Sequence, residues 1–361
     1  MIKQAPDTPK RFIPFRKADI VQMCLQENQL PSQEDEFRQL CHMLASVFHF
    51  EFHKVLEALN DRYAPIDPDA DTRSIDNNPQ SPEPDFIQLL NGLLEKANYE
   101  RISEDELNQA LTEASLFRIR LQVDLDDFSE VLLFCRGVSQ RKETLSSLFG
   151  LIKKTIHFTN YDRVVLYIRF RDDFSEHKDL LPVCKPGATL LKLFQNVPRA
   201  DLEMLFPNTA VRMRLMDKLL IGIPAVVSGG VVLTTKLGAS LVLAGSLLGF
   251  WLGLHNEPVE LNKTTLMVLL AGVVALGGYL WKQFSNFNNR KMRFMQALTQ
   301  NLYFKNLDNN AGVFYRLAND AEEEECKEAV LAYYFLLCAD RGLSKTELDQ
   351  KIEEKLADLT A

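Results

Sequence analysis

The chain has 361 residues, with 41 basic and 49 acidic side chains and a formal net charge of −8. This length suits two or three folded units, and the acidic balance excludes a protein that holds nucleic acid on a basic surface. The six cysteines are scattered, without a CxxC pair or zinc-finger spacing. We therefore expect buried, reduced thiols facing a cytoplasm-like compartment.

The N-terminal region, residues 1–63, is predicted to be helical. Apolar residues recur at helical spacing between residues 32 and 59, among them Phe37, Leu44 and Val55. Residues 64–85 are rich in proline, aspartate and asparagine and poor in apolar side chains. This composition is typical of a flexible linker or a long loop.

Residues 86–200 are predicted to form a small α+β domain. Ser103 and Glu106 have the spacing of a capping box, which opens a helix because the two side chains satisfy free backbone amides reciprocally. After a turn, residues 189–194 are predicted to start a further helix. Alternating apolar and polar residues predict three strands of a small sheet, over residues 117–123, 128–136 and 163–171.

Residues 201–290 are the predicted membrane region, because three stretches in it carry no charged side chain, namely 219–235, 237–254 and 264–281. Eighteen helical residues rise roughly 27 Å, close to the roughly 30 Å hydrocarbon core of a bilayer. Basic residues flank the region on both sides, which favours two spans, 237–254 and 264–281, as a transmembrane helical hairpin. The stretch 219–235 is left open as a third span, a re-entrant or interfacial helix, or an extension of the first span.

Two sets of residues in this region have predicted roles at the membrane. Small residues four apart predict close helix packing, either within the hairpin or between copies of the chain, at Gly245, Gly249, Gly253, Ala271 and Ala275. Basic residues beside the apolar stretches are predicted to meet lipid headgroups, at Arg212, Arg214, Lys218 and Lys282. Neither span contains a carboxylate, an arginine or a lysine, which disfavours an ion or proton path.

Residues 291–361 are predicted to form a C-terminal helical domain. The acidic run at residues 322–325 is interpreted as the start of a helix, where negative charge suits the helix dipole. Ser344 and Glu347 form a second capping box ahead of the last helix. The predicted fold class is therefore α+β: a mostly helical cytoplasmic domain with a small β-sheet, a transmembrane helical hairpin and a C-terminal helical segment.

Motifs that carry chemistry are few. His49 and His53 lie one helical turn apart and are a candidate metal pair, although the HExxH order of a zinc protease is absent and a position at the edge of the core is the favoured interpretation. The chain has no GxxxxGK[ST], GxGxxG or GxSxG motif. We therefore predict no catalytic residue and no cofactor, and an enzyme is the less favoured class.

Five segments carry a family resemblance and follow one another in the family's order. They are RFIPFRKADIV at 11–21, DFSEVLLFCRG at 127–137, FQNVPRADLEMLFPNT at 194–209, RLMDKLLIGIP at 214–224, and residues 301–337. The chain thereby resembles the transmembrane-protein-143-like family, whose defining domain is the domain of unknown function 3754. The resemblance implies two spans and, for a bacterial member, the inner membrane. It implies no catalytic residue.

From these observations we expect a multi-pass inner-membrane protein with both termini in the cytoplasm, acting as a non-enzymatic, membrane-anchored interaction or scaffold protein. Two alternatives stay open. One is an oligomeric channel or transport component packed through the glycine face, and the other is a membrane-tethered enzyme with an unrecognised site. The expected partners are the lipid bilayer and either further copies of the chain or other membrane proteins, and not nucleic acid.

Overall fold

The computed structural model describes residues 11–26, 34–71, 84–112, 120–147, 152–174, 184–212, 245, 251–252, 263–339 and 341–360. By its internal contacts the chain divides into two compact units. Unit 1 comprises Met1–Leu116, Gln122–Ala210 and Phe304–Ala361, and unit 2 comprises Phe117–Leu121 and Val211–Tyr303. Unit 1 thus brings the N-terminal and C-terminal parts of the chain into one body.

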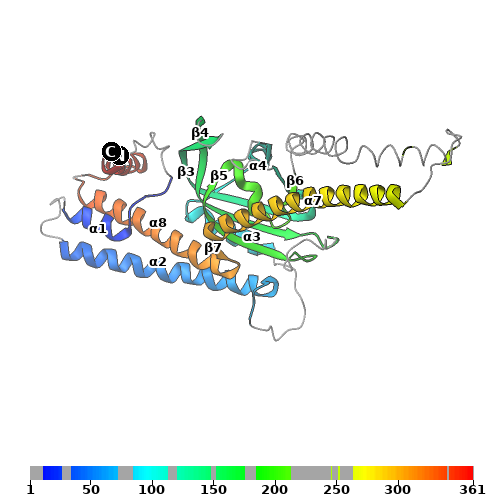
Figure 1. The fold of residues 1–361 in the computed structure, drawn as a ribbon. Coiled ribbons are helices and arrows are strands. Elements are labelled where there is room, and N and C mark those ends of the chain that lie inside the picture. The colour runs from blue at the N-terminus through cyan, green and yellow to red at the C-terminus, as the bar shows by residue number, and fades with distance from the viewer. Residues whose placement is uncertain are drawn as a thin grey trace. The chain divides into compact units, whose positions relative to one another are not determined.

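A five-stranded antiparallel sheet forms the centre of unit 1 (Figure 1). The strand order is β1-β3-β4-β5-β7, with β1 at Glu100–Arg101, β3 at Phe128–Ser147, β4 at Ile152–Phe170, β5 at Thr189–Pro198 and β7 at Asn306–Asn309. The long strands β3 and β4 pair from Phe128 opposite Phe170 to Ser147 opposite Ile152. The short strand β7 comes from the C-terminal part of the chain and pairs with β5.

Helices from both ends of the chain pack on one face of this sheet. The register places Leu132, Tyr167 and Leu191 side by side on neighbouring strands, and these buried residues share a core with Phe86 and Phe314. The helices of unit 1 are α1 (Lys17–Gln26), α2 (Glu34–Tyr63), α3 (Pro84–Lys96), α4 (Glu104–Thr112), α8 (Ala311–Leu337) and α9 (Lys345–Thr360). Because α8 packs along α2, α3 and the sheet, it is the element that joins the two ends of the chain.

The opposite face of the sheet is apolar as well. Leu133 and Leu166 point to this side and are almost wholly buried. The 3-10 helix η3 (Arg199–Leu205) packs against β4, β5 and α4. Two other short 3-10 helices, η1 (Ala64–Ile66) and η2 (Leu125–Asp127), lie after α2 and before β3. The central strands are therefore covered on both sides.

Asn310, which precedes α8, joins three parts of unit 1. Its φ of 48° is combined with a ψ of −127°, a backbone conformation that glycine adopts readily and other residues rarely do. Its side-chain oxygen accepts hydrogen bonds from the Tyr63 hydroxyl at 2.9 Å and the Leu191 amide at 3.2 Å, and its side-chain nitrogen donates to Asp69 at 2.5 Å. The end of α2, strand β5 and the start of α8 are thereby fixed together.

The structure confirms several local predictions. Ser103 and Glu106 form the predicted reciprocal capping bonds at the start of α4, and Ser344 and Glu347 do so at the start of α9. The predicted strands at 128–136 and 163–171 belong to β3 and β4, apart from Arg171, which follows β4. Part of the predicted strand at 117–123 is β2 (Arg120–Gln122), which pairs with β6 (Ala210–Arg212) in a separate two-stranded sheet.

The helix predicted to start at residues 189–194 is wrong, because these residues begin β5. Seven of the ten residues of β5 are buried, including Leu190 and Leu191 on opposite faces. A strand covered on both faces is apolar throughout, so its sequence has neither the period of two of a half-exposed strand nor the 3.6-residue period of a helix. The sequence pattern alone could not separate the two.

The predicted transmembrane helical hairpin is also corrected. The apolar stretch 264–281 is not a helix of its own, because it forms only the first part of α7 (Lys263–Lys305), which continues past Lys282 through a charged second half. The other predicted span, 237–254, lies outside the described residues apart from positions 245, 251 and 252, and 219–235 lies wholly outside them. Within the described part of the chain, no helix combines the length and the apolar character that a membrane crossing needs. For that part the predicted hairpin is wrong, and the multi-pass inner-membrane location that depended on it falls with it.

Candidate functional site

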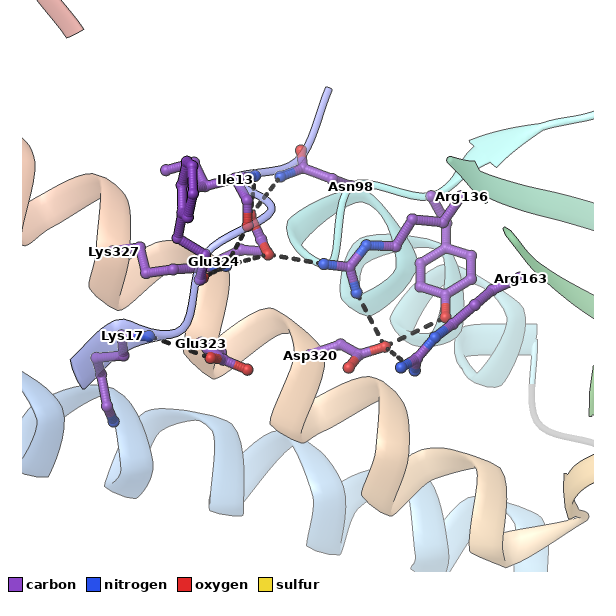
Figure 2. Close-up of polar contacts among 11 residues, drawn as sticks. Ile13, Lys17, Asn98, Arg136, Arg163, Asp320, Glu323, Glu324 and Lys327 are labelled. Carbon is purple, nitrogen blue, oxygen red and sulfur yellow. Dashed lines mark hydrogen bonds and ion pairs between the residues drawn. The ribbon is translucent and has the colours of Figure 1, made fainter. Parts of the chain in front are cut away.

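The most concentrated set of buried charges lies where α8 passes the sheet and the N-terminal segment, residues 11–17 (Figure 2). Asp320, Glu324 and Lys327 are four and three residues apart on α8, and this spacing places them on one helical face. Their exposed fractions are only 8%, 1% and 3%. With Arg136 of β3 and Arg163 of β4 they form what we call the charge cluster.

Glu324 is the centre of the charge cluster. Its Oε1 atom accepts hydrogen bonds from Arg136 Nη2 and Lys327 Nζ, both at 2.7 Å. Its Oε2 atom accepts from the backbone amide of Ile13 at 3.1 Å and from Asn98 Nδ2 at 3.5 Å. A buried carboxylate is costly unless it is paired and hydrogen-bonded, and here four donors from four parts of the chain meet that requirement.

Lys327 fixes the N-terminal segment to α8. Its ammonium group donates to the backbone carbonyls of Ile13 at 2.7 Å and Phe15 at 3.2 Å, besides its bond to Glu324. An ammonium group has three protons to donate, so every donor of Lys327 has a partner. The amide of Lys17 donates to the neighbouring Glu323 at 3.3 Å. The N-terminal segment is therefore held by backbone hydrogen bonds that do not depend on its own side chains.

The two arginines connect the charge cluster to the sheet. Arg136 and Arg163 lie opposite each other on β3 and β4, and both reach Asp320 Oδ2, at 3.0 Å and 2.9 Å. The Tyr99 hydroxyl donates to the same oxygen at 3.2 Å. Burial first, and then the charge of Asp320, raise the pKa of Tyr99 above its ordinary value, so the phenol stays protonated and remains a donor. The Arg136 guanidinium also lies 4.6 Å from the centre of the Phe12 ring.

Local backbone conformation positions two members of this site. Asn98 ends α3 with a φ of 59°, and the amides of Tyr99 and Asn98 donate to the carbonyls of Leu94 and Glu95. This is the Schellman pattern, in which a left-handed residue closes a helix. Gly137 follows Arg136 with a φ of 73°, and a Cβ atom there would lie 2.6 Å from a carboxylate oxygen of Asp162. A glycine is therefore required beside the arginine.

Chemically, the charge cluster is closed. Its two carboxylates are occupied by donors of the fold, and no described group in it is a nucleophile next to a base. The adjacent Cys326 is wholly buried, and burial raises the pKa of its thiol. Cys24 and Cys41 lie in the same core as Cys326, and burial raises the pKa of Cys24 to about 12 and that of Cys41 to about 11. The thiols in this core are therefore protonated and poorly reactive near neutral pH.

Two hollows on unit 1 are candidate binding places outside the charge cluster. A groove of about 460 Å³ lies between α2 and α3, with Phe52 and Leu93 among its apolar lining residues. A pocket of about 260 Å³ lies between α4 and the start of β3. That pocket contains Ser129 and Glu130, and burial raises the pKa of Glu130, but no histidine or cysteine lines it. Neither hollow assembles the partners of a nucleophilic site.

The predicted metal pair does not gain a third ligand. The rings of His49 and His53 on α2 lie stacked with their centres 6.4 Å apart. Each has a carboxylate neighbour instead: His49 Nδ1 lies 3.0 Å from Glu322, and His53 Nε2 lies 3.5 Å from Glu57. Among the described residues, no group of three or more potential metal ligands is found.

The residues predicted to pack helices or to meet lipid are only partly described. A Cβ atom on Gly245 would meet no described atom within 4 Å, and Ala271 and Lys282 are exposed on α7. Arg212 ends β6, and its side chain, like that of Ala275, is outside the description. Gly249, Gly253, Arg214 and Lys218 lie outside the described residues altogether. None of the described residues among them belongs to the charge cluster.

The acidic run at 322–325 was expected to start a helix, and this prediction is wrong because α8 starts at Ala311. Glu324 lies in the middle of α8 and supplies the buried carboxylate of the charge cluster. The sequence did contain a signal: Asp320, Glu324 and Lys327 share a helical face with the apolar residues Leu317 and Leu331, both wholly buried. Charged residues on an apolar helix face indicate a buried ion pair.

Comparison with known proteins gives a domain of unknown function. Residues 161–312 match a family model described as "Protein of unknown function (DUF3754)". The match begins within β4 and ends at the first turn of α8, so it contains Arg163 but not the acidic members of the charge cluster. No solved structure matches the chain. The function must therefore be inferred from the fold and the charge cluster.

Proposed function

We propose that this chain is a non-enzymatic interaction or scaffold protein. The observation that carries the proposal is that the buried charges, where chemistry would be sought first, are bonded within the fold itself. The charge cluster ties the N-terminal segment, α8 and the sheet into one body. Its role is to make that body rigid, and a rigid body presents binding surfaces at a low entropic cost.

Exposed apolar side chains on the same body support this role. Tyr333, Leu336 and Leu337 near the end of α8 are 45%, 44% and 47% exposed. Leu336 and Leu337 follow Tyr333 by three and four residues, so the three side chains lie together on one side of the helix. Gathered apolar side chains on a surface are characteristic of sites that bind a protein partner. This cluster is therefore the first place to test for one.

We further infer a relationship to the transmembrane-protein-143-like family. The support is the order of the five similar segments along this chain, together with the match of residues 161–312 to the domain of unknown function. An alignment of that family tests the relationship through the charge cluster. Members that align along the whole chain should keep an acid at positions 320 and 324 and a base at positions 136 and 327. Family members without these pairs would remove the support.

The interaction role is tested by crosslinking the full chain in its native cell and purifying it under stringent conditions. The test variant is Leu336→Asp with Leu337→Asp, and the matched control is Glu353→Lys with Glu354→Lys on the exposed side of α9. We expect one or more partners to be lost in the test variant and retained in the control. A purified chain that turns over a substrate, and loses this activity with Glu130→Gln in the pocket beside α4, would contradict the proposal.

A further inference from the structure

One face of α2 is apolar and is left exposed by the described residues of unit 1. Met43, Val47 and Phe50 are 60%, 62% and 61% exposed, more than most apolar side chains of the unit. Their spacing of four and three residues places them on one face of the helix. Figure 1 shows α8 along one side of α2, and the contacts of α2 with the described α1, α3 and α8 leave these three side chains exposed.

The two ends of this face carry opposite charge. Glu36 lies one heptad before Met43, and Lys54 lies four residues after Phe50, so both share the face with the apolar residues. Both are exposed. The Lys54 ammonium group lies 4.3 Å from the centre of the Phe50 ring, which keeps it directly on this surface. No described residue forms an ion pair with Glu36 or Lys54.

This arrangement is complementary to a second copy of itself. In an antiparallel pair of α2 helices, a register centred on Ala45 places Met43 opposite the partner's Val47. The same register places Glu36 opposite the partner's Lys54, because both pairs are centred on the same residue. Phe50 then packs between the partner's Leu40 and Met43, the way a side chain of a coiled coil fits between residues of the facing helix.

We propose that the chain forms a symmetric dimer through antiparallel packing of α2, with an apolar centre of Met43, Val47 and Phe50 and two flanking Glu36–Lys54 pairs. A twofold interface uses the same surface on both partners, as this face requires. The contact from residue 36 to residue 54 is about 27 Å long at 1.5 Å per residue. A single helix pair of this length lies at the small end of specific interfaces, so a dissociation constant on the order of micromolar is expected.

The inference deepens the proposed interaction role, because it names one partner as a second copy of this chain. The dimer rests on the proposed interaction role, but the two can be tested separately because the α2 face and the apolar cluster at the end of α8 are different surfaces. A chain that is monomeric but still loses a crosslinked partner with the Leu336 and Leu337 substitutions overturns the dimer alone. A dimer that crosslinks to nothing else leaves the dimer standing and overturns the wider role.

The test is sedimentation equilibrium of the full chain between about 1 and 200 µM, a range that brackets the expected micromolar affinity. The wild type should dimerise in this range, and Val47→Asp should abolish the dimer. Glu36→Lys and Lys54→Glu should each weaken it about tenfold or more, since each reverses two exposed ion pairs. The double variant Glu36→Lys with Lys54→Glu should restore it to within about threefold, because each pair then re-forms with its signs exchanged.

Matched controls use charges on another helix. Lys351→Glu and Glu353→Lys on α9 are exposed and should leave the dissociation constant unchanged. The far-ultraviolet circular dichroism of every variant should match the wild type, since all substituted positions are exposed. A wild type that stays monomeric up to 200 µM overturns the proposal. So does a dimer that Val47→Asp leaves intact, or one that the double charge exchange fails to restore.

Discussion

Replacing Glu324 by glutamine tests the central claim about the charge cluster. The substitution keeps the size of the side chain and removes its charge, so the neighbouring Arg136 and Lys327, each 2.7 Å from Glu324 Oε1, lose their shared counter-ion. Glutamine also points an amide donor toward groups that are themselves donors. Removing one partner of a buried ion pair destabilises a protein by about 3–5 kcal/mol. We expect Glu324→Gln to lie in that range, which is a large fraction of the about 5–15 kcal/mol that stabilises a typical domain.

The measurement must report on unit 1. Both tryptophans, Trp251 and Trp281, belong to unit 2, so tryptophan fluorescence would follow the wrong part of the chain. Amide hydrogen exchange of peptides from α8 gives the free energy of opening of this helix directly. The control is Glu325→Gln, the adjacent acid, which has no hydrogen bond or ion pair with a described residue and should change stability by about 0.5 kcal/mol or less. A loss below about 1 kcal/mol for Glu324→Gln, or equal losses in both variants, would refute the reasoning.

Three further predictions follow from the same contacts. Lys327→Met leaves the carbonyls of residues 13 and 15 without their hydrogen-bond donor. Limited proteolysis between residues 11 and 26 should therefore become at least about tenfold faster. An unchanged rate would show that the N-terminal segment does not depend on this lysine. Asn310→Gly and Asn310→Ala both lose three side-chain hydrogen bonds, but only glycine relieves the strain of this backbone conformation, which is about 1–3 kcal/mol. Hydrogen exchange of α8 should therefore rank alanine as the worse variant, and the reverse order would contradict this account. Burial raises the pKa of Cys24 and Cys135 from 9.0 to about 12. As the pH rises from 9 toward 12 the thiols therefore ionise first in the unfolded chain, and the free energy of unfolding should fall by up to about 1.4 kcal/mol per pH unit and thiol. The loss of stability between pH 8 and pH 10, measured by urea denaturation, should be smaller in the double variant Cys24→Ala with Cys135→Ala, and an equal loss would show that other groups cause it.

Short-range chemistry was readable from the sequence. The capping boxes at Ser103 and Ser344 formed as predicted because each depends on residues only three positions apart. The alternating patterns within β3 and β4 were also sufficient to predict these strands, because the alternation of apolar and polar residues within one strand indicates which side chains face the core. Helix α2 was found for the same reason, and Phe37 of the predicted apolar pattern is buried in it.

Longer-range features were misjudged where one pattern fits two structures. Residues 189–198 are apolar on both faces because β5 is covered on both sides, and this pattern does not distinguish a strand from a helix. The stretch 264–281 has the composition of a membrane span but is the beginning of the longer helix α7. An acidic run suits a helix start or a buried ion pair equally well, and residues 322–325 were assigned to the first.

The sequence by itself determined where α4 and α9 begin, the alternation within β3 and β4 and that no familiar catalytic motif is present, because these properties depend on neighbouring residues. Only the tertiary structure decided that Glu324 would be buried between Ile13, Asn98 and Arg136, residues that lie more than 180 positions away along the chain. The physical reason is that a charged group buried in a low-dielectric core is stable only when all its hydrogen-bonding and ion-pair partners are in place. The packing of α8 between α2 and the sheet decides which groups become the partners of Glu324, and the sequence of one helix does not contain this information.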